Sequence, residues 1–340
     1  MKDCYFLKKK IRKINNISIV IPTYNEIDYL LHLLESIKKI DYPLNSFEII
    51  VVSDGSEDGT VKAVRDSYLN VKLIDLPTNI GRYQARKIGA EVAKFDNILF
   101  IDSRTLVDPG ILNIINQTDY KAINGVVESG NPKNHFQIFF KAIRRRVYPK
   151  FYTNPSTPIE INQSNFDSLP KGTTVFFVQK DILFIAYNEL SKQEMGKLAS
   201  DDTKMIRKIV EYTPILLHPG VKITHFVRKT FYKNFLHLIW RGSTFVDYYL
   251  DPSKRQFWLV IIFPFLALTS LFVVLISLPI PWTYKFGFII IVDILIAAYL
   301  AKNVYEILVI SYILPACVTS FYLGIFRGIF LKIFSIIKLT

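Results

Sequence analysis

The chain has 340 residues, half of them hydrophobic, and a formal net charge of +13. A mean hydropathy of +0.25 is too high for an ordinary soluble domain, and the basic excess indicates anionic lipid or phosphates as partners. Nucleic acid is the weaker interpretation, because a hydrophobic tail and acidic motifs accompany the basic residues.

Residues 1–15 form a basic segment that is not followed by a long apolar stretch. This pattern does not fit a signal peptide, so we expect a C-terminal membrane anchor. Cys4 lies in this segment and Cys317 lies in a predicted membrane span. A disulfide between them is not expected, which fits a reducing cytoplasm.

Short apolar runs alternate with helical patterns over the next 110 residues or so. Helices are predicted from Asn25, Asp58 and Asn79. The alternation predicts an α/β, Rossmann-like domain with a parallel, doubly wound sheet. The predicted strands are 17–24, 47–54, 71–77, 97–102 and 122–128.

Polar clusters follow three of these strands, at 23–26, 53–56 and 102–104. Ligands of doubly wound sheets bind beyond the carboxyl ends of the strands. Asp54-Gly55-Ser56 alone is typical of a turn. Two acid-containing loops at one sheet edge instead predict carboxylates that accept hydrogen bonds from a nucleotide base and ribose.

The stretches IVIPTYNE, IIVVSDGSEDGT, NIGRYQARKIGAEVA, ILFIDSRT and SDDTKM together resemble glycosyltransferase family 2. This family contains inverting enzymes with a Rossmann-like, GT-A-type nucleotide-sugar domain. The resemblance covers about residues 15–245 and implies a UDP- or GDP-sugar donor. It implies that the donor base and ribose are lined by Pro22, Tyr24, Glu26 and Asp54.

The segment NIGRYQARKIGA places three basic residues at the start of a helix, where backbone N–H groups and cations suit a diphosphate. The resemblance favours Gly81 and Arg86 for this role, with Arg82 nearby. Lys87 is expected to face water.

FIDSRT departs from the family pattern. Asp102 matches the first acid of the usual Asp-x-Asp motif, whereas Arg104 replaces the second acid, which in the family holds a divalent metal. An arginine cannot bind Mg²⁺ or Mn²⁺, so Asp102 is the one candidate metal ligand. Either Arg104 neutralises the diphosphate itself, or the metal site and the activity are lost. We favour the first interpretation. Arg104 follows Asp102 by two residues on an extended strand end, so both side chains are expected to point to the same face of the sheet.

The middle of the chain is less regular. Residues 136–148 are amphipathic and end in Arg144, Arg145 and Arg146, which either meet a lipid phosphate or form a solvated run. A loop is predicted at 150–170, a strand at 173–179, and a helix from Ser200.

Inverting transfer needs a carboxylate that takes the proton of the attacking hydroxyl. Asp201 and Asp202 match the family's acidic pair, which implies that Asp202 is the base and Asp201 its supporting acid. Either can also cap the helix. His218, His225 and Arg241 occupy later family positions as candidate acceptor residues, although a lone histidine is more often a packed residue.

The tail contains two uncharged stretches, 257–284 and 307–326, each long enough to span a bilayer. A third, 286–301, is short and interrupted by Asp293. We expect a catalytic domain at 16–250 and a membrane domain at 256–340. Lys254 and Arg255 place the catalytic domain in the cytoplasm by the positive-inside preference. Two spans with an interfacial helix return Arg327, Lys332 and Lys338 to that side.

The sequence therefore predicts a multi-pass cell-membrane glycosyltransferase. It would move a sugar from a nucleotide-diphosphate donor to a polyprenyl phosphate or lipid-linked saccharide, in surface polysaccharide or glycoconjugate assembly. The alternative is an inactive family member that acts as a membrane-bound binding or scaffold subunit, for which Arg104 is the main support.

Overall fold

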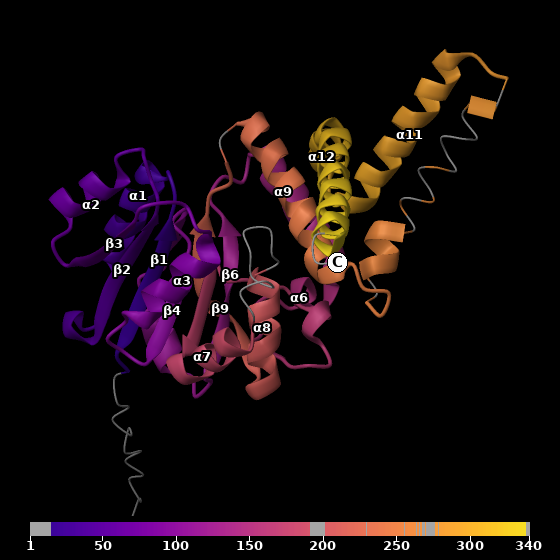
Figure 1. Cartoon of the computed structure of the whole chain (residues 1–340). Coiled ribbons are helices and arrows are strands. Elements are labelled where there is room, and N and C mark those ends of the chain that lie inside the picture. Colours follow the sequence, from indigo (N-terminus) through magenta and orange to yellow (C-terminus); the bar gives the residue numbers. More distant parts are fainter. Residues whose placement is uncertain are drawn as a thin grey trace, which may run out of the picture.

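The computed structural model describes residues 15–190, 201–228, 230–254, 256–262, 264, 266, 269, 276–277 and 279–337. In this part of the chain, strands of a single sheet lie in the order β3-β2-β1-β4-β8-β6-β9-β5, and β7 pairs with β9 (Figure 1). The tail helices stand beside this domain. The expected basic segment falls almost wholly outside the described residues.

The first four strands are parallel, as predicted. They are β1 (Ile17–Thr23), β2 (Phe47–Asp54), β3 (Val71–Leu76) and β4 (Asn97–Ile101). Their bounds lie within one or two residues of the prediction, because each is an apolar run that ends at a polar cluster.

The second half of the sheet is mixed, so the prediction of a parallel sheet is wrong there. β8 (Val175–Gln179) runs antiparallel to both β4 and β6 (Ala122–Ser129). β9 (Ile215–His225) is parallel to β6, while β5 (Thr105–Val107) and β7 (Ile159–Ile161) pair antiparallel with β9. Apolar periodicity identifies a buried strand, but it does not specify the neighbour or the direction of that strand.

Helices cover both faces of the sheet, and the alternating side chains of each strand divide between two cores. α1 (Ile27–Ile37), α2 (Thr60–Ser67) and α4 (Ile111–Asn116) pack on the side of Ile19 and Val51. The opposite side, with Val20 and Val52, is covered by α3 (Arg82–Glu91), α7 (Lys180–Glu189) and α8 (Asp201–Tyr212). The carboxyl ends of β1, β2 and β4 are thereby left open for a site.

Two described helices are long and apolar enough to cross a membrane. They are α11 (Trp282–Leu300), over its whole length, and α12 (Val304–Ile337), over Val304–Phe334. The segment that we expected to be broken by Asp293 is the continuous helix α11. Of the expected span 257–284, the structure describes a π-helical stretch at Phe257–Ile262, single residues and short pieces up to 277, and residues 279–284, where α11 begins.

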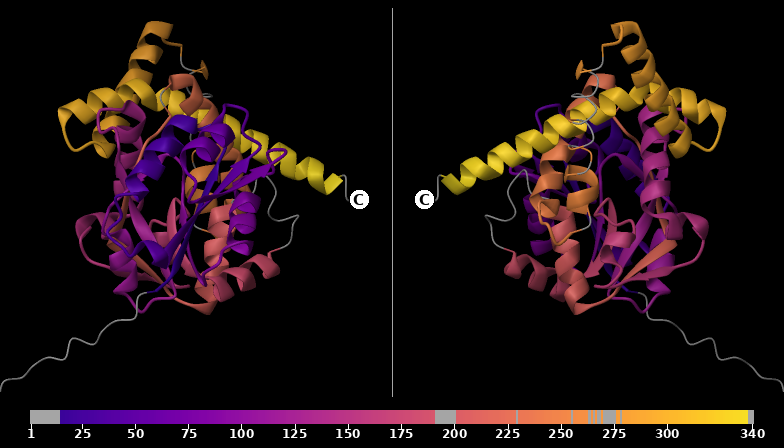
Figure 2. Two further views of the ribbon diagram at one scale, coloured as in Figure 1. Left: turned by 90° about the vertical axis from the view of Figure 1, so that its left-hand side faces the viewer. Right: turned by 90° about the vertical axis from the view of Figure 1, so that its right-hand side faces the viewer.

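The expected interfacial helix is continuous with α12, whose 34 residues extend for about 50 Å. Figure 2 shows its C-terminal part projecting past the catalytic domain. Arg327 and Lys332 lie on this part, while Lys338 is outside the described residues.

Two helices of the sheet domain join the tail. α5 (His135–Val147) and α9 (Phe231–Tyr249) form one apolar cluster with α11 and α12. Arg145 of α5 also makes a two-pronged ion pair with Glu306 of α12, at 3.1 and 2.5 Å. The sheet domain is therefore held against the tail helices by apolar packing and by a specific ion pair.

α9 and α12 approach each other very closely because their contact is made by glycines. A Cβ atom on Gly324 would lie 2.1 Å from the carbonyl oxygen of Ile239 and 2.9 Å from the Cα of Gly242. The hydroxyl of Ser243 donates to the carbonyl oxygen of Gly324 at 3.0 Å. Small residues at helix contacts of this kind are typical of packing within membranes.

We predict that Gly324→Ala separates α9 from α12 and lowers the stability of the full-length protein by about 1–3 kcal/mol, as overpacking does elsewhere. Gly287→Ala is the matched control, because a Cβ there meets no atom within 4 Å. Thermal unfolding in detergent, followed by tryptophan fluorescence, measures both. Equal midpoints for the two variants would show that the close helix contact is unimportant.

Candidate functional site

The loops after β1 and β2 are bound to each other. The amide of Asn25 donates to the Ser56 hydroxyl at 3.1 Å, and the Asn25 side-chain oxygen accepts from the amide of Glu57 at 2.8 Å. Asp58 accepts from the amide of Ile27, at the start of α1, at 3.1 Å. The two acidic motifs of the sequence therefore form one folded unit. Tyr24 lies on its surface with 47% of its area exposed, whereas Pro22 is buried in β1.

Asp54 fixes the loop before α3. Its carboxylate accepts hydrogen bonds from the amides of Ile80 and Gly81, at 2.7 and 3.0 Å. Gly55 next to it has φ +70°, and a Cβ there would lie 2.6 Å from the backbone nitrogen of Asn79. Asp54 therefore positions the start of α3, and its contact with the donor stays a prediction.

Arg86 is the centre of the site. Its side chain is buried, and it bridges Asp102, at 2.6 Å from Nη2 to Oδ1, and Asp202, at 2.9 Å from Nη1 to Oδ1. Arg82, one turn earlier in α3, lies 3.6 Å from the other oxygen of Asp202. The end of β4 and the start of α8 are thus joined by one guanidinium group, as bidentate pairing allows.

The pKa values of Asp202 and Glu26 are shifted in opposite directions. Burial alone would raise the pKa of Asp202, but the charges of Arg82 and Arg86 outweigh it and hold that pKa below its ordinary value. For Glu26, burial prevails over the attraction of Arg104, so its pKa is raised. Asp202 is therefore ionised at neutral pH. The side chain of Asp201 lies outside the described residues.

Arg104 does not have the extended geometry that we expected. The chain turns after β4, where the Thr105 hydroxyl donates to the Asp102 carbonyl oxygen at 2.7 Å. The guanidinium of Arg104 pairs with Glu26, at 3.0 Å from Nε to Oε1, and pairs with neither Asp102 nor Asp108. Its Nη1 is buried without a hydrogen-bond partner, and a buried donor of this kind is suited to an incoming anion.

The residues present are a poor match for a divalent metal. Within the described residues no cluster of three or more His, Cys, Asp or Glu side chains could hold one. Asp102 is engaged by Arg86, and Arg104 contributes a positive charge where the family has a second acid. Hard cations need several oxygen ligands, so this set favours an arginine-based diphosphate site.

The late candidate residues have unequal environments. Burial lowers the pKa of His225, at the end of β9, to about 4, and the charge of Arg104 acts in the same direction. His225 is therefore neutral at pH 7. His218 accepts from the amide of Gly220 at 3.0 Å, as a packed turn residue does. Arg241 lies on α9. Burial lowers its pKa, and the charges of Arg82 and Arg144 act in the same direction.

Sequence reasoning missed three residues of this region, Arg228, His237 and Trp240. Arg82 lies over the ring of Trp240 at 4.8 Å, and His237 stacks on the same ring at 5.6 Å. The spacing of three residues within HLIWRG could have revealed that His237 and Trp240 share one face of α9.

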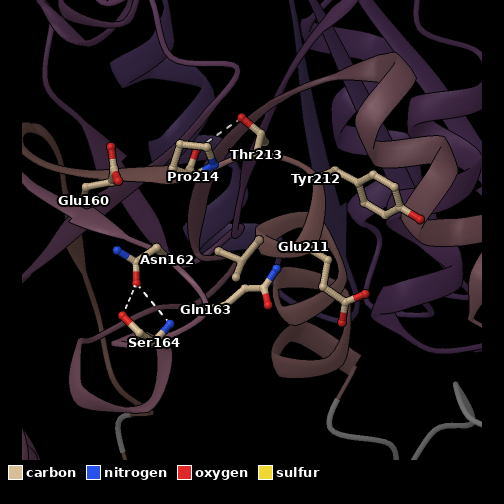
Figure 3. Close-up of a pocket in the computed structure, with 9 residues that line it drawn as sticks. Glu160, Asn162, Gln163, Ser164, Glu211, Tyr212, Thr213 and Pro214 are labelled. Atoms are coloured by element: carbon tan, nitrogen blue, oxygen red, sulfur yellow. Dashed lines mark hydrogen bonds between the residues drawn. The ribbon is translucent and has the colours of Figure 1, made fainter.

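A separate surface cavity of about 460 Å³ lies beside β7 and the end of α8 (Figure 3). Its lining includes Glu160, Asn162 and Tyr212 and none of the motif residues. We assign it no role.

Residues 18–166 match the sequence model of Glycosyl transferase family 2. The poly(ribitol-phosphate) beta-N-acetylglucosaminyltransferase TarS of Staphylococcus aureus is 38% identical over 89 residues, 25% of this chain and 16% of the relative. The poly-beta-1,6-N-acetyl-D-glucosamine synthase of Staphylococcus epidermidis is 30% identical over 104 residues, 30% of this chain and 25% of the relative. The matched segments thus span a quarter or less of these two relatives.

The solved structures that resemble the chain share its fold. The mannosyltransferase PcManGT from Pyrobaculum calidifontis, in complex with GDP-Man and Mn²⁺, has a TM-score of 0.60 at 16% identity, over 93% of this chain and 88% of that one. S. aureus TarS 1-349 in complex with UDP-GlcNAc has a TM-score of 0.51 at 17% identity, over 73% and 77%. The mixed α/β fold of this chain is therefore the GT-A fold.

Proposed function

Because the chain belongs to glycosyl transferase family 2, we propose that it transfers a sugar, with inversion, from a nucleotide-diphosphate donor to a membrane-bound acceptor. The acceptor is a polyprenyl phosphate or a lipid-linked saccharide, in surface polysaccharide or glycoconjugate assembly. Two of the similar proteins carry names that refer to polymers of this kind. The observation that carries the proposal is the bridge of Arg86 between Asp102 and Asp202.

The donor lies along the open strand ends. The base and ribose rest near Pro22, Tyr24 and Glu26, and the diphosphate lies near Gly81, Arg86 and Arg104, where backbone amides and guanidinium groups meet. Positive charge at this position stabilises the nucleotide diphosphate as it leaves, and stabilisation of developing charge often contributes more to catalysis than any other effect.

Asp202 is the proposed general base. With a lipid-linked saccharide as acceptor, Asp202 takes the proton from the attacking hydroxyl as that oxygen bonds to the anomeric carbon, and the bond from that carbon to the diphosphate oxygen breaks on the opposite face. A polyprenyl phosphate would attack through an ionised phosphate oxygen and would need no base. A diphosphate would draw Arg82 and Arg86 away from Asp202. The pKa of Asp202 would then rise from its lowered value, which makes it a better base when the donor is bound.

The tail helices support a location of this site at a membrane. α11 and α12 have the length and composition of spans, and α5 and α9 hold the catalytic domain against them. Lys254, just before the tail, favours a cytoplasmic catalytic domain. Its expected companion Arg255 lies outside the described residues.

An inactive binding subunit remains the alternative, supported by Arg104 at the position of the second metal-binding acid. The two functions differ in turnover. Release of UDP or GDP from any nucleotide sugar, with membrane lipid extract as acceptor, supports the enzyme, whereas nucleotide binding without release supports the subunit.

We predict that Asp202→Asn lowers kcat by about 10²–10⁴, because the base is lost while the hydrogen bond to Arg86 can persist. Calorimetric affinity for the nucleotide should change much less. Asp66→Asn, on the exposed side of α2, is the control. If Asp201→Asn is the damaging change and Asp202→Asn is mild, the proposed roles are reversed.

We predict that transfer survives EDTA and fails in Arg104→Ala, because the arginine supplies the charge that a metal supplies elsewhere. Exposed Arg65→Ala is the control for loss of a cation. Arg104 pairs with Glu26 and is proposed to hold the diphosphate. Glu26→Gln tells these two roles apart, because it removes the ion pair but leaves the guanidinium group in place. If transfer is lost in EDTA and returns with Mn²⁺, while the Arg104→Ala variant stays active, the proposal that Arg104 replaces the metal is refuted.

A further inference from the structure

Cationic side chains extend beyond the donor site toward the tail. Arg144 comes from α5, Arg228 follows β9, and Arg241 comes from α9. We call these three the junction arginines. The charges of Arg82 and Arg144 act on Arg241, and those of Arg104, Arg82 and Arg241 act on Arg228. Glu26 attracts Arg228 and Asp202 attracts Arg241, but the guanidinium groups outnumber these carboxylates. The junction arginines and the donor-side arginines therefore form one field with a net positive charge.

None of the ion pairs among the described residues of this site includes a junction arginine. In the described part of the chain, the ion pairs of Glu26, Asp102 and Asp202 are made with Arg104, Arg86 and Arg82. No described carboxylate lies within 4.0 Å of a junction arginine, and Nε of Arg144 is buried without a hydrogen-bond partner. Burial followed by repulsion from Arg104 lowers the pKa of Arg228 to about 10. Such an arrangement is costly until an anion enters it.

The junction arginines are only partly hydrated. Arg144 and Arg228 are half-buried, and Arg241, at the surface, lies over the ring of Phe140 at 5.8 Å. Tyr148, at the end of α5, is close enough to Arg241 and Arg144 for their charges to act on its pKa. Guanidinium groups in such a partly desolvated position bind phosphate oxygens strongly.

Two of the junction arginines lie where the sheet domain meets the tail helices. Arg144 is followed by Arg145, which pairs with Glu306 of α12. Arg241 is followed by Gly242, where a Cβ would lie 2.1 Å from the Phe321 carbonyl oxygen of α12. Two of the junction arginines are therefore one residue from a direct contact with a candidate membrane span. A phosphate that enters from a bilayer would meet them before it met the donor-side residues.

We propose that Arg144, Arg228 and Arg241 bind the phosphate of the acceptor lipid. This inference rests on the proposed function, and it deepens that function by assigning the acceptor a phosphate that is held apart from the diphosphate of the donor. Arg82, Arg86 and Arg104 serve the donor, and Arg82 over Trp240 lies between the two groups.

The test uses the full-length protein in detergent and measures binding of farnesyl phosphate, farnesol, inorganic phosphate and UDP by calorimetry. Farnesyl phosphate should bind, and farnesol and inorganic phosphate should bind at least 10-fold more weakly. The double variant Arg144→Gln with Arg241→Gln should lower the affinity for farnesyl phosphate by about 10- to 100-fold. Affinity for UDP should stay within about twofold. Lys150→Gln, an exposed charge in α6 (Pro149–Thr153), is the matched control.

Arg241→Lys guards against a folding defect, because it keeps the charge and loses the planar fork, and it should give an intermediate affinity. Unchanged farnesyl phosphate binding in the double variant would overturn the inference. An equal loss of UDP affinity would assign the junction arginines to the donor site. Inorganic phosphate that binds as tightly as farnesyl phosphate would show that the lipid chain is not recognised. Either result overturns the inference.

Turnover of nucleotide sugars is measured separately, so the two proposals can fail independently. No turnover with any donor, together with arginine-dependent farnesyl phosphate binding, refutes the proposed transferase and keeps the lipid-phosphate site. Transfer that is unaffected in the double variant refutes the site and keeps the transferase.

Discussion

The buried guanidinium of Arg86 is the interaction on which the candidate site depends. Asp102 and Asp202 are 100 residues apart in the chain, and without Arg86 both carboxylates would lose a short ion pair in a partly buried setting, although Arg82 would still lie 3.6 Å from Asp202. Leaving one partner of a buried ion pair alone is strongly destabilising. The loop that starts α3 is in turn fixed by Asp54, so the motif around Asp54 positions Arg86, and Arg86 positions the two acids.

The same charge distribution continues toward the two candidate membrane spans. α5 and α9, which carry Arg144 and Arg241, also pack on α12, through an apolar cluster and a close glycine contact. Close packing of this kind fixes the distance between α12 and the sheet edge.

Motif residues were predictable from the sequence wherever they follow a buried strand. β1, β2 and β4 end at the polar clusters that contain Glu26, Asp54 and Asp102, and the α8 motif supplies Asp202, so their convergence follows from sheet geometry. The antiparallel course of β8 was not predictable, because a five-residue apolar run carries no information about direction. The partner of Arg104 was missed because it depends on a turn after β4, and Arg228 was missed because no motif contains it.

The central claim is that Arg86 joins the donor site to the catalytic base, and Arg86→Lys tests it most directly. A lysine keeps the positive charge but cannot bridge two carboxylates with a planar fork. Calorimetry with UDP and GDP, together with kcat at saturating donor, gives both readouts on one variant. Nucleotide affinity and kcat are both expected to fall at least 10-fold, since one variant disturbs both acids. Wild-type values for both in Arg86→Lys would contradict the claim.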